Sequence, residues 1–402
     1  MAYLPRVIDQ LLDDRLETSS VVLLDGARAT GKTTTASRRA KSEFRFPRDL
    51  DLVESDPHQV LAGADRPVLV DEWQLAGTEL LWAIKAIVDD DPSPGSFILT
   101  GSVEPAAYGP TYPLTGRGTH ITLRPMSRRE LVGRGAGPLW LDRLLAGELT
   151  VPGRGWLGTE VGELTVTGFP AAPARSSADW LRSYALTIAE RDIENRRDPV
   201  RVTRLLRVLA ELESQAVPDE HLWRAADINR ATLASYRQML QRTHIRADLP
   251  AWESNRIKRI TTYPKLQYID AALALALARV GPAELKRDPI LTGRYLESFV
   301  AAQLRPECDR AGAVLHHVRT KGGEHEIDLL IELEHGMVAI EVKAGVRPRA
   351  ADARHLVWLR EQLGGRLLAA IVLHRGDTTF QLVDGVWALP ISSLWSGSTS
   401  TA

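Results

Sequence analysis

The residues with the clearest chemical meaning form a glycine-rich stretch, Gly26-Ala-Arg-Ala-Thr-Gly31-Lys32-Thr33, which matches the pattern G-x-x-x-x-G-K-[ST]. An apolar run at 21–25 precedes it and a helical stretch at 32–42 follows, which is the context that the motif requires. Such a loop turns backbone N–H groups toward phosphate oxygens, and glycine permits the dihedral angles that this needs. The sequence therefore predicts a phosphate-binding loop, with ATP and Mg²⁺ as cofactors.

The motif assigns a role to each of its polar side chains. Lys32 is expected to reach the β- and γ-phosphates, and the Thr33 hydroxyl is expected to coordinate Mg²⁺. The other residues expected around the nucleotide are Gly26, Arg28, Ala29, Thr30, Gly31 and Thr34.

A second motif, Val68-Leu-Val-Asp71-Glu72, is an apolar strand that ends in two acids. A carboxylate at a strand end that faces a phosphate loop can hold the magnesium ion and its waters, and Asp71 takes that role. Hydrolysis also needs an acceptor beside the γ-phosphate, and Glu72 is the candidate base that orients the attacking water. The other interpretation of an Asp-Glu pair here is the N-terminal cap of a helix.

Three further residues are candidates on the same sheet edge. The run Phe97-Ile-Leu-Thr100-Gly-Ser102 predicts a strand that ends in hydroxyls, and Thr100 or Ser102 could sense the γ-phosphate. Arg117, in Pro-Leu-Thr-Gly-Arg, is a candidate arginine finger that acts in cis or from a neighbouring subunit; the other interpretation is a surface arginine in a loop.

Short apolar runs alternate with helical stretches up to about residue 130, which predicts a parallel sheet covered by helices. From about 175 to 280 the pattern is helical, and from about 290 it is mixed, with strands expected near 314–319, 325–333, 337–344 and 367–375. Two glycine-rich stretches, 133–138 and 152–158, resemble hinges. We therefore expect an α/β protein with an ATPase domain (1–132), a helical and winged-helix region (133–285), an α/β C-terminal domain (286–392) and a disordered tail (393–402).

The runs GARATGKTTT, VLVDEWQ, ILTGS and LTGRGTHITLRPMSRREL together resemble a widespread prokaryotic family of AAA-type P-loop ATPases. The resemblance continues through TGFPA, YPKLQYIDAALALAL, EIDLLI and AIEVKAG, so it covers nearly the whole chain in the family's order. It implies a C-terminal domain with a restriction-endonuclease-like fold and a poorly known function. This sequence departs from the family pattern at Thr30 of the glycine-rich stretch, where the family more often has Val or Ser. That position contributes mainly its backbone to nucleotide binding.

Composition limits the class of protein. The chain has 402 residues, 50 Lys plus Arg, 51 Asp plus Glu and a formal net charge of −1, which excludes a uniformly basic nucleic-acid binder. Its one cysteine, Cys308, excludes an intramolecular disulfide framework. No apolar run approaches the ~20 residues that cross a bilayer, and residues 1–17 lack the pattern of a signal peptide. We expect a cytoplasmic protein without a membrane partner.

Residues 227–265 combine a helix-turn-helix pattern with local basic charge. The range has a local charge of +5, because it contains three acids, Asp227, Asp248 and Glu253, and eight basic residues. The basic residues are Arg230, Arg237, Arg242, Arg246, Arg256, Lys258, Arg259 and Lys265. A basic face on such a module is typical of a DNA contact. The alternative, a winged-helix module used only for packing or subunit contacts, remains open.

The C-terminal strands carry the pattern of a PD-(D/E)XK nuclease. In Val338-Ala-Ile-Glu341-Val-Lys343, the apolar residues alternate with Glu341 and Lys343, and Asp328 lies on the partnering strand. Carboxylates of Asp328, Glu341 and the helical Glu297 would bind Mg²⁺, and Lys343 would position or activate a water. The other interpretation is an inactive remnant in which Glu341 and Lys343 form a buried ion pair.

Two functions follow from these motifs. The protein is either an ATP-dependent factor that binds and cuts DNA through residues 227–265 and the nuclease-like domain, or an ATP-driven switch with protein partners. In the second case the nuclease-like domain serves recognition or scaffolding, and the partner is another protein or a second copy of the chain. The candidate catalytic residues are Lys32, Glu72, Arg117 and Lys343.

Overall fold

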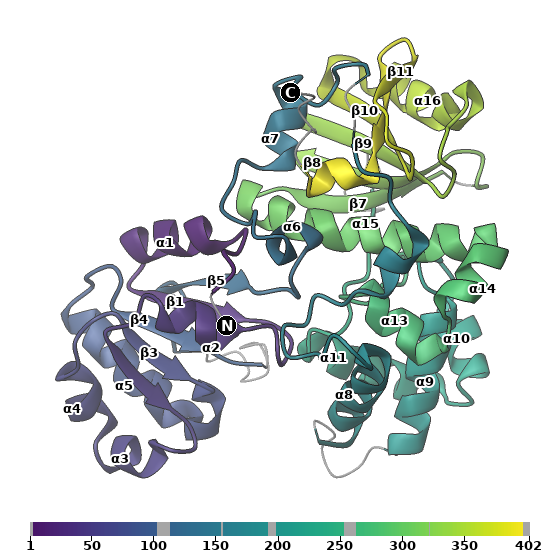
Figure 1. Cartoon of the computed structure of the whole chain (residues 1–402). Coiled ribbons are helices and arrows are strands. Elements are labelled where there is room, and N and C mark those ends of the chain that lie inside the picture. The colour runs from purple at the N-terminus through teal and green to yellow at the C-terminus, as the bar shows by residue number, and fades with distance from the viewer. Residues whose placement is uncertain are drawn as a thin grey trace.

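The computed structural model describes residues 3–102, 113–153, 156–191, 198–252, 263–320 and 322–396. An N-terminal α/β part lies at the lower left of Figure 1, a helical middle part at the lower right, and a second sheet at the upper right. The predicted tail is partly wrong, because Ser393 and Leu394 lie buried in the short 3₁₀ helix η6 (Ile391–Leu394). Residues 397–402 lie outside the described residues.

The N-terminal part contains a five-stranded parallel sheet in the order β2-β3-β4-β1-β5. This confirms the predicted parallel α/β sheet. Because the strands are parallel, their carboxyl ends meet at one edge, and the register pairs Asp71 and Leu24 with Thr100 there. The strand bounds are β1 (Val21–Asp25), β2 (Ser42–Arg45), β3 (Val68–Asp71), β4 (Phe97–Thr100) and β5 (Gly118–Thr122).

Helices cover both faces of this sheet, since its strands are apolar on both sides. On β1, Val21 and Leu23 pack in one cluster with Leu81 and Ile84 of α5, while Val22 and Leu24 pack in another with α1. The helices are α1 (Asp9–Thr18), α2 (Lys32–Ser37), α3 (Leu50–Ser55), α4 (Pro57–Ala62) and α5 (Gly77–Asp90), with the 3₁₀ helix η1 (Trp73–Ala76).

The middle part consists mostly of helices. After α6 (Arg128–Leu131), α7 (Trp140–Leu145) and η3 (Val161–Thr165) come α8 (Ser177–Arg191), α9 (Pro199–Glu211), α10 (Asp219–Ala225), α11 (Arg230–Arg242), α13 (Ala271–Ala278) and α14 (Pro282–Arg287). Antiparallel bridges join Arg246 to Tyr268 and Leu249 to Lys265. Residues 253–262, which include three of the predicted basic residues, lie outside the described residues. The winged-helix assignment stays a prediction.

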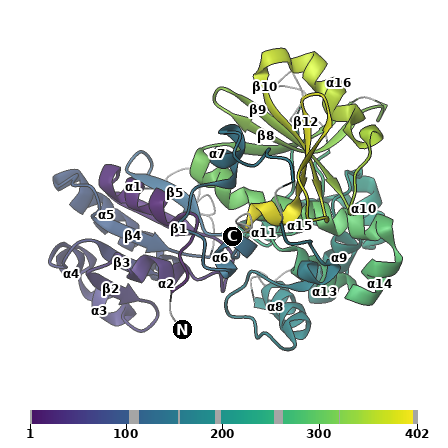
Figure 2. The ribbon, with the colours of Figure 1, turned by 45° about the horizontal axis from the view of Figure 1, so that its top comes forward.

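The C-terminal part is a mixed seven-stranded sheet in the order β11-β12-β10-β9-β8-β7-β6. Figure 2 shows helix α16 beyond one face of this sheet and α15 along the other. The alternation predicted for β9 is present, because Val338 and Ile340 pack on the α15 side and Met337 and Ala339 on the α16 side. The bounds are β6 (Ala251–Trp252), α15 (Pro289–Ala311), β7 (Val314–Arg319), β8 (Glu326–Leu333), β9 (Gly336–Lys343), η4 (Ala350–Ala353), α16 (Arg354–Leu363), η5 (Gly364–Arg366), β10 (Leu367–His374), β11 (Phe380–Val383) and β12 (Val386–Pro390).

The middle and C-terminal parts share one apolar core. A single cluster contains Leu205 of α9, Leu273 of α13, Phe299 of α15 and Ile340 of β9. Helix α7 also packs there, and the Trp140 indole N–H donates to the Ser393 hydroxyl at 3.1 Å. The restriction-endonuclease-like fold that the resemblance implies for the C-terminal sheet stays a prediction.

Where the structure describes them, both glycine-rich stretches contact neighbouring segments, and their role as a hinge region stays a prediction. A Cβ atom on Gly135 would lie 1.9 Å from the Pro5 carbonyl oxygen. In the second stretch, the Gly153 and Trp156 amides donate to the Thr379 and Asp377 carbonyls of the C-terminal part. Gly135 therefore permits a close backbone contact that a side chain would prevent.

Candidate functional site

The phosphate loop follows β1 and leads directly into α2, as the motif requires. Gly26 has a φ of +135°, and a Cβ there would lie 2.3 Å from the Leu123 carbonyl oxygen, so only glycine fits. Gly31 has a φ of +97° and forms the N-cap of α2. Thr30 is fully buried and its hydroxyl donates to the Ala27 carbonyl, so its side chain stays inside the loop.

Three predicted site residues meet at the carboxyl edge of the sheet. The Thr33 hydroxyl donates to both Asp71 carboxylate oxygens at 2.9 and 3.0 Å, and the Thr100 hydroxyl donates to the same carboxylate. The structure thus brings together the threonine of the loop, the acid of the second motif and the polar end of β4. A hydroxyl and a carboxylate are oxygen donors of the kind that Mg²⁺ accepts beside substrate phosphates, so the residues present fit that ion.

Lys32 is 6% exposed, and its ammonium donates to the Gly26 and Ala27 carbonyls at 2.9 Å each. These contacts hold the side chain along the inner side of the loop. Burial lowers the pKa of Lys32 to about 8, although the nearby carboxylates Glu72 and Asp71 act in the opposite direction. A phosphate would therefore strengthen the charged form of this lysine.

Glu72 follows Asp71 directly and has a left-handed backbone conformation, with φ 56° and ψ 42°. The Gln74 side-chain amide donates to its carboxylate. Left-handed backbone is uncommon for a residue other than glycine and costs free energy. The catalytic role of Glu72 stays a prediction. Ser102 lies buried just beyond β4, at 3% exposed.

Arg117 lies at the other end of the sheet, so the structure contradicts a role as an arginine finger in cis. It precedes β5, whose first residue Gly118 pairs with Val21, whereas the loop follows Asp25, which pairs with Thr122. The four intervening residue steps span about 13 Å. Its guanidinium forms an ion pair with Asp89 at 2.5 Å. A role toward a nucleotide in a neighbouring subunit stays a prediction.

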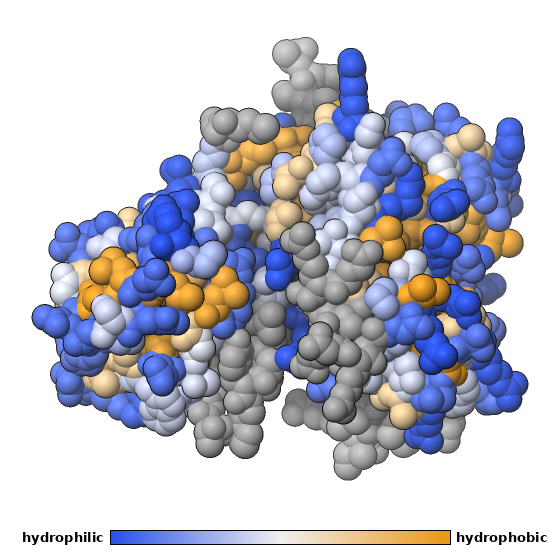
Figure 3. All heavy atoms as spheres, turned by 90° about the horizontal axis from the view of Figure 1, so that it is seen from below, coloured by the Kyte–Doolittle hydropathy of each residue, from blue (hydrophilic) through white to orange (hydrophobic). Residues whose placement is uncertain are grey.

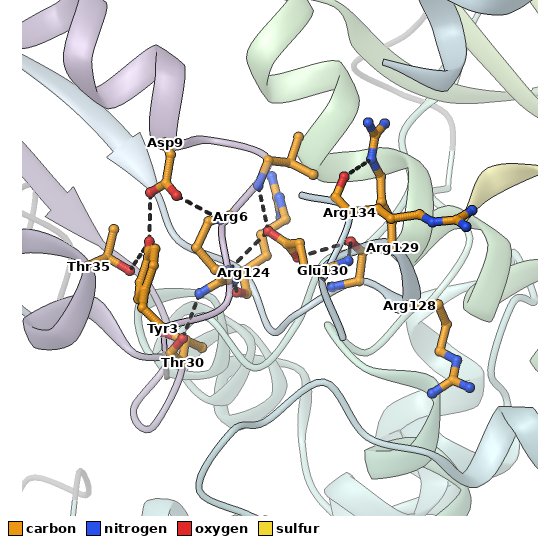
Figure 4. Close-up of polar contacts among 12 residues, drawn as sticks. Tyr3, Arg6, Asp9, Thr30, Thr35, Arg124, Arg128, Arg129, Glu130 and Arg134 are labelled. Carbon is orange, nitrogen blue, oxygen red and sulfur yellow. Dashed lines mark hydrogen bonds and ion pairs between the residues drawn. The ribbon is translucent and has the colours of Figure 1, made fainter. Parts of the chain in front are cut away.

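Arg6, which the sequence interpretation did not select, holds the phosphate loop from outside. Its guanidinium donates to the Thr30 carbonyl at 3.0 Å, to the Arg124 carbonyl at 2.7 Å and to the Glu130 carboxylate at 3.0 Å. Figure 4 shows Arg6 between Thr30 and Glu130. Arg6 is 4% exposed and Glu130 is 1% exposed, so this ion pair is buried.

Glu130 belongs to a segment, residues 124–131, that we call the junction. Its carboxylate also accepts from the Val7 amide and closes a capping box with Ser127 at the start of α6. The sequence signal was present, since Ser-x-x-Glu before a helix is the capping-box pattern, but nothing in it shows that Arg6 lies opposite.

The junction is fixed to α15 by ion pairs. Arg129 contacts Glu307 at 2.7 Å, and both side chains are nearly buried. Arg124 contacts Asp309 at 2.5 Å. The phosphate loop is thereby connected through Arg6 and the junction to the longest helix of the C-terminal part. The middle part also reaches the loop, since the Tyr184 hydroxyl of α8 donates to the Arg28 carbonyl at 3.1 Å.

Two members of the predicted C-terminal constellation, Glu297 and Asp328, lie against Lys265, a residue that the sequence places only in a basic face. Its ammonium lies 2.9 Å from Glu297, 3.1 Å from Glu326 and 3.3 Å from Asp328. Within the described ranges, no group of three or more His, Cys, Asp or Glu side chains is arranged to hold a metal ion. The structure therefore contradicts the predicted metal site of Glu297, Asp328 and Glu341, because a lysine already compensates the carboxylates.

Glu341 and Lys343 form the ion pair that the inactive-remnant interpretation expected, with Nζ and Oε2 2.7 Å apart. The Val342 amide donates to Asp328 at 2.9 Å, which fixes that carboxylate against β9. Burial raises the pKa of Glu341 above its usual value, and the neighbouring Asp328 adds to this rise. Burial and Asp328 likewise raise the pKa of Glu297 to about 8.

The predicted basic face is largely neutralised where the structure describes it. Arg237 forms ion pairs with Asp219 and Asp248, and Arg246 is buried against Asp248. Lys265 points to the C-terminal carboxylates. Arg230 is exposed and Arg242 is half-buried on α11, while Arg256, Lys258 and Arg259 lie outside the described residues. Three of the eight predicted cations therefore have internal partners.

In the described part of the chain, no helix combines the length and apolar character needed to cross a membrane. Comparison with known protein families finds three matches: an AAA domain over residues 18–132, a domain of unknown function (DUF8612) over 164–284, and a domain of unknown function (DUF4143) over 292–394. No curated protein matches the chain.

Two solved structures resemble the chain in part. A Walker-type ATPase of Pyrococcus abyssi is 17% identical, covers 67% of this chain and 94% of its own, and gives a TM-score of 0.41. A protein from Vibrio cholerae is 15% identical, covers 97% of this chain and 92% of its own, and gives a TM-score of 0.21. Since both TM-scores are below 0.5, the assignment rests on the family match and on the geometry of the loop. Residues 18–132 match an AAA domain, and their glycine-rich loop between β1 and α2 has the geometry of a phosphate-binding loop.

Proposed function

We propose that the protein binds Mg-ATP at the phosphate loop, hydrolyses it, and uses the nucleotide state as a switch for its middle and C-terminal parts. The observation that carries this proposal is the meeting of Thr33, Asp71 and Thr100 through one carboxylate. These are the residues that a phosphate loop, a metal-holding acid and a phosphate sensor each need, and they come from three separate segments.

Each residue has a distinct task in this proposal. The loop amides and Lys32 bind the phosphates, and Thr33 and Asp71 would hold Mg²⁺, which when bound supplies neutralisation of phosphate charge. Glu72 accepts a hydrogen bond from the attacking water and orients it toward the γ-phosphate. Thr100, which shares Asp71 with Thr33, responds to the charge on that phosphate.

The contacts of Arg6 support the switch. Its guanidinium bonds the loop at Thr30 and the junction at Glu130, and Arg129 of the junction bonds Glu307 of α15. A nucleotide that rearranges the loop carbonyls must change the first of these contacts. The other two then transmit the change, because buried ion pairs are directional and costly to leave unpaired.

A protein partner is favoured over a DNA substrate. The described basic residues of 227–265 are partly neutralised, and the C-terminal carboxylates surround a lysine. Figure 3 shows apolar side chains at the surface of the N-terminal part, on the left of that view. In that part Leu52, Leu75 and Trp82 are each more than half exposed. We propose that the partner is a protein, which includes a second copy of the chain.

The ATPase proposal is tested by ATP titration and by phosphate release. Lys32→Ala should abolish ATP binding, whereas Glu72→Gln should keep binding and lose turnover by about 100-fold, since it removes one acid–base contribution. Glu79→Gln on the exposed face of α5 is the matched carboxylate control and should behave as wild type. Turnover that survives Lys32→Ala would overturn the proposal.

A separate assay addresses the nuclease alternative. Plasmid and single-stranded DNA are incubated with Mg²⁺ or Mn²⁺ and wild type, Asp328→Ala or Lys343→Ala. We expect no cleavage by any of the three, and no salt-sensitive DNA binding. Cleavage by wild type that is lost in both variants would show an active nuclease and would replace the partner proposal.

A further inference from the structure

The carboxylates of the C-terminal part converge on a cation that the chain itself supplies. Lys265 is 2% exposed, and its ammonium contacts Glu297 of α15 and both Glu326 and Asp328 of β8 within 3.3 Å. A lysine is almost never buried without partners. Here the ammonium donates hydrogen bonds to Glu297 and Asp328 and forms an ion pair with Glu326, so the position between these carboxylates is a built cation site.

The backbone fixes the lysine at this place. The Lys265 amide and carbonyl both pair with Leu249, at 2.9 and 2.8 Å, in one of the antiparallel bridges of the middle part. The carboxylates, in contrast, belong to α15 and β8 of the C-terminal part. The ammonium therefore reaches across from one part of the chain into a site formed by the other.

Glu341 gives a second, independent sign that the site suits cations. It is 3% exposed, one of its oxygens bonds Lys343, and its Oε1 atom is buried without a hydrogen-bond partner in the described structure. Its pKa is raised first by burial and then by the charge of the neighbouring Asp328. Such a carboxylate oxygen beside the cluster is unusual, because buried polar atoms are normally paired.

The distances fit an ammonium and are too long for a bare magnesium ion. Nitrogen–oxygen separations of 2.9 to 3.3 Å are hydrogen-bond lengths, whereas Mg²⁺ binds oxygen at about 2.0–2.1 Å. The carboxylates are thus spread around the lysine. An incoming metal would have to displace the ammonium and draw the carboxylates inward.

We propose that Lys265 is a tethered counter-cation that closes the C-terminal carboxylate site of Glu297, Glu326 and Asp328 to divalent metal ions. Without the ammonium, the same carboxylates form a site for one divalent cation of the Mg²⁺ or Mn²⁺ class. This assignment does not depend on ATP hydrolysis, because the site lies in the C-terminal part and involves none of the phosphate-loop residues.

The test measures Mn²⁺ binding by the full-length protein without nucleotide, from the loss of the free Mn²⁺ paramagnetic resonance signal. In wild type, Asp328 should not contribute to Mn²⁺ binding. The Mn²⁺ binding isotherms of wild type and Asp328→Asn should therefore be the same. Lys265→Ala should bind one Mn²⁺ more than wild type does, and Lys265→Ala combined with Asp328→Asn should lose this additional ion.

Lys286→Ala, which removes an exposed lysine of α14, is the control for lost positive charge and should bind as wild type does. Thermal unfolding of each variant shows whether it is folded, and Lys265→Ser serves as a second variant that leaves the same space. Two results would overturn the proposal: Asp328-dependent Mn²⁺ binding by wild type, or no additional ion in a folded Lys265→Ala or Lys265→Ser protein.

Discussion

At the scale of single residues, the phosphate loop depends on one buried lysine. Lys32 contacts two loop carbonyls and lies near Glu72 and Asp71, yet burial outweighs these carboxylates and lowers its pKa to about 8. Bound phosphate would favour the charged form, so ATP binding and protonation of Lys32 are linked. Neutral Lys32 lacks the positive charge that attracts the phosphates of ATP.

This linkage predicts that ATP affinity falls as the pH rises through 8. Between pH 7 and pH 9 the charged fraction of free Lys32 drops by about tenfold, and the dissociation constant should rise by about the same factor. Isothermal titration at constant magnesium and ionic strength measures this. Thr33→Ala should bind more weakly at each pH but keep the pH dependence. A dissociation constant that is unchanged from pH 7 to 9 would contradict the pKa of about 8.

At the scale of elements, the junction connects the loop to α15 through a buried ion pair. We expect Arg6→Gln to destabilise the protein by about 3 kcal/mol, because Glu130 then keeps a buried charge without its main partner. The same variant should weaken ATP binding, since the Thr30 carbonyl loses its bond to the guanidinium. Chemical denaturation and ATP titration measure the two effects.

The control for Arg6 is Arg15→Gln on the exposed face of α1, which removes an arginine from the same part of the chain. It should change stability by less than about 0.5 kcal/mol, as surface substitutions usually do. Equal free energies of unfolding for Arg6→Gln and Arg15→Gln would show that the ion pair of Arg6 with Glu130 does not stabilise the protein.

The stretch 133–138 gives a prediction about backbone contact. Gly135→Ala should destabilise the protein by about 3 kcal/mol, because its Cβ would collide with the Pro5 carbonyl and neither backbone segment can easily move. Gly162→Ala is the matched control, since its Cβ would meet nothing within 4 Å. Thermal melting of both variants distinguishes a packed segment from a hinge, for which the two substitutions would have similar effects.

Sequence reasoning could predict the elements whose signal is local. The strand–loop–helix of the phosphate site and the strands 314–319 and 367–374 are apparent from apolar runs and from glycine positions. It could also place Asp71 and Thr100 at one edge, since parallel strands share that edge. It could not find Arg6 or Lys265, because their carboxylate partners Glu130 and Glu297 are more than 30 residues away and only the folded chain brings them together.

The predictions for Arg117, for residues 133–138 and for residues 227–265 were limited by the same cause, because each depends on contacts that form only in the folded chain. Arg117 was assigned by its residue type and its neighbours, but its position along β5 relative to β1 decides which edge it occupies. The glycines of 133–138 are typical of a hinge region, but their composition does not show that Gly135 lies against the Pro5 carbonyl. Net charge over 227–265 indicated a DNA contact, although ion pairing with residues outside and inside that range neutralises part of it.

At the scale of the whole molecule, the chain has two main bodies. They are joined by the ion pairs of the junction and by Val7 and Ala27 of the N-terminal part, which pack in the core of the middle and C-terminal parts. The middle and C-terminal parts share one apolar core, while the parallel sheet of the AAA domain has its own. Between them lie the ion pairs of the junction, Arg124 with Asp309 and Arg129 with Glu307. Polar contacts of this kind can exchange partners more readily than a continuous core, so relative movement is the expected response to ATP.

The most direct test of this central claim is small-angle X-ray scattering of the Glu72→Gln variant with and without Mg-ATP. This variant should bind ATP and retain it, so the bound state accumulates. The account predicts that ATP changes the scattering profile, and that the same addition to Lys32→Ala leaves its profile unchanged. Identical profiles of the Glu72→Gln variant with and without bound ATP would contradict the claim that the nucleotide moves one body relative to the other.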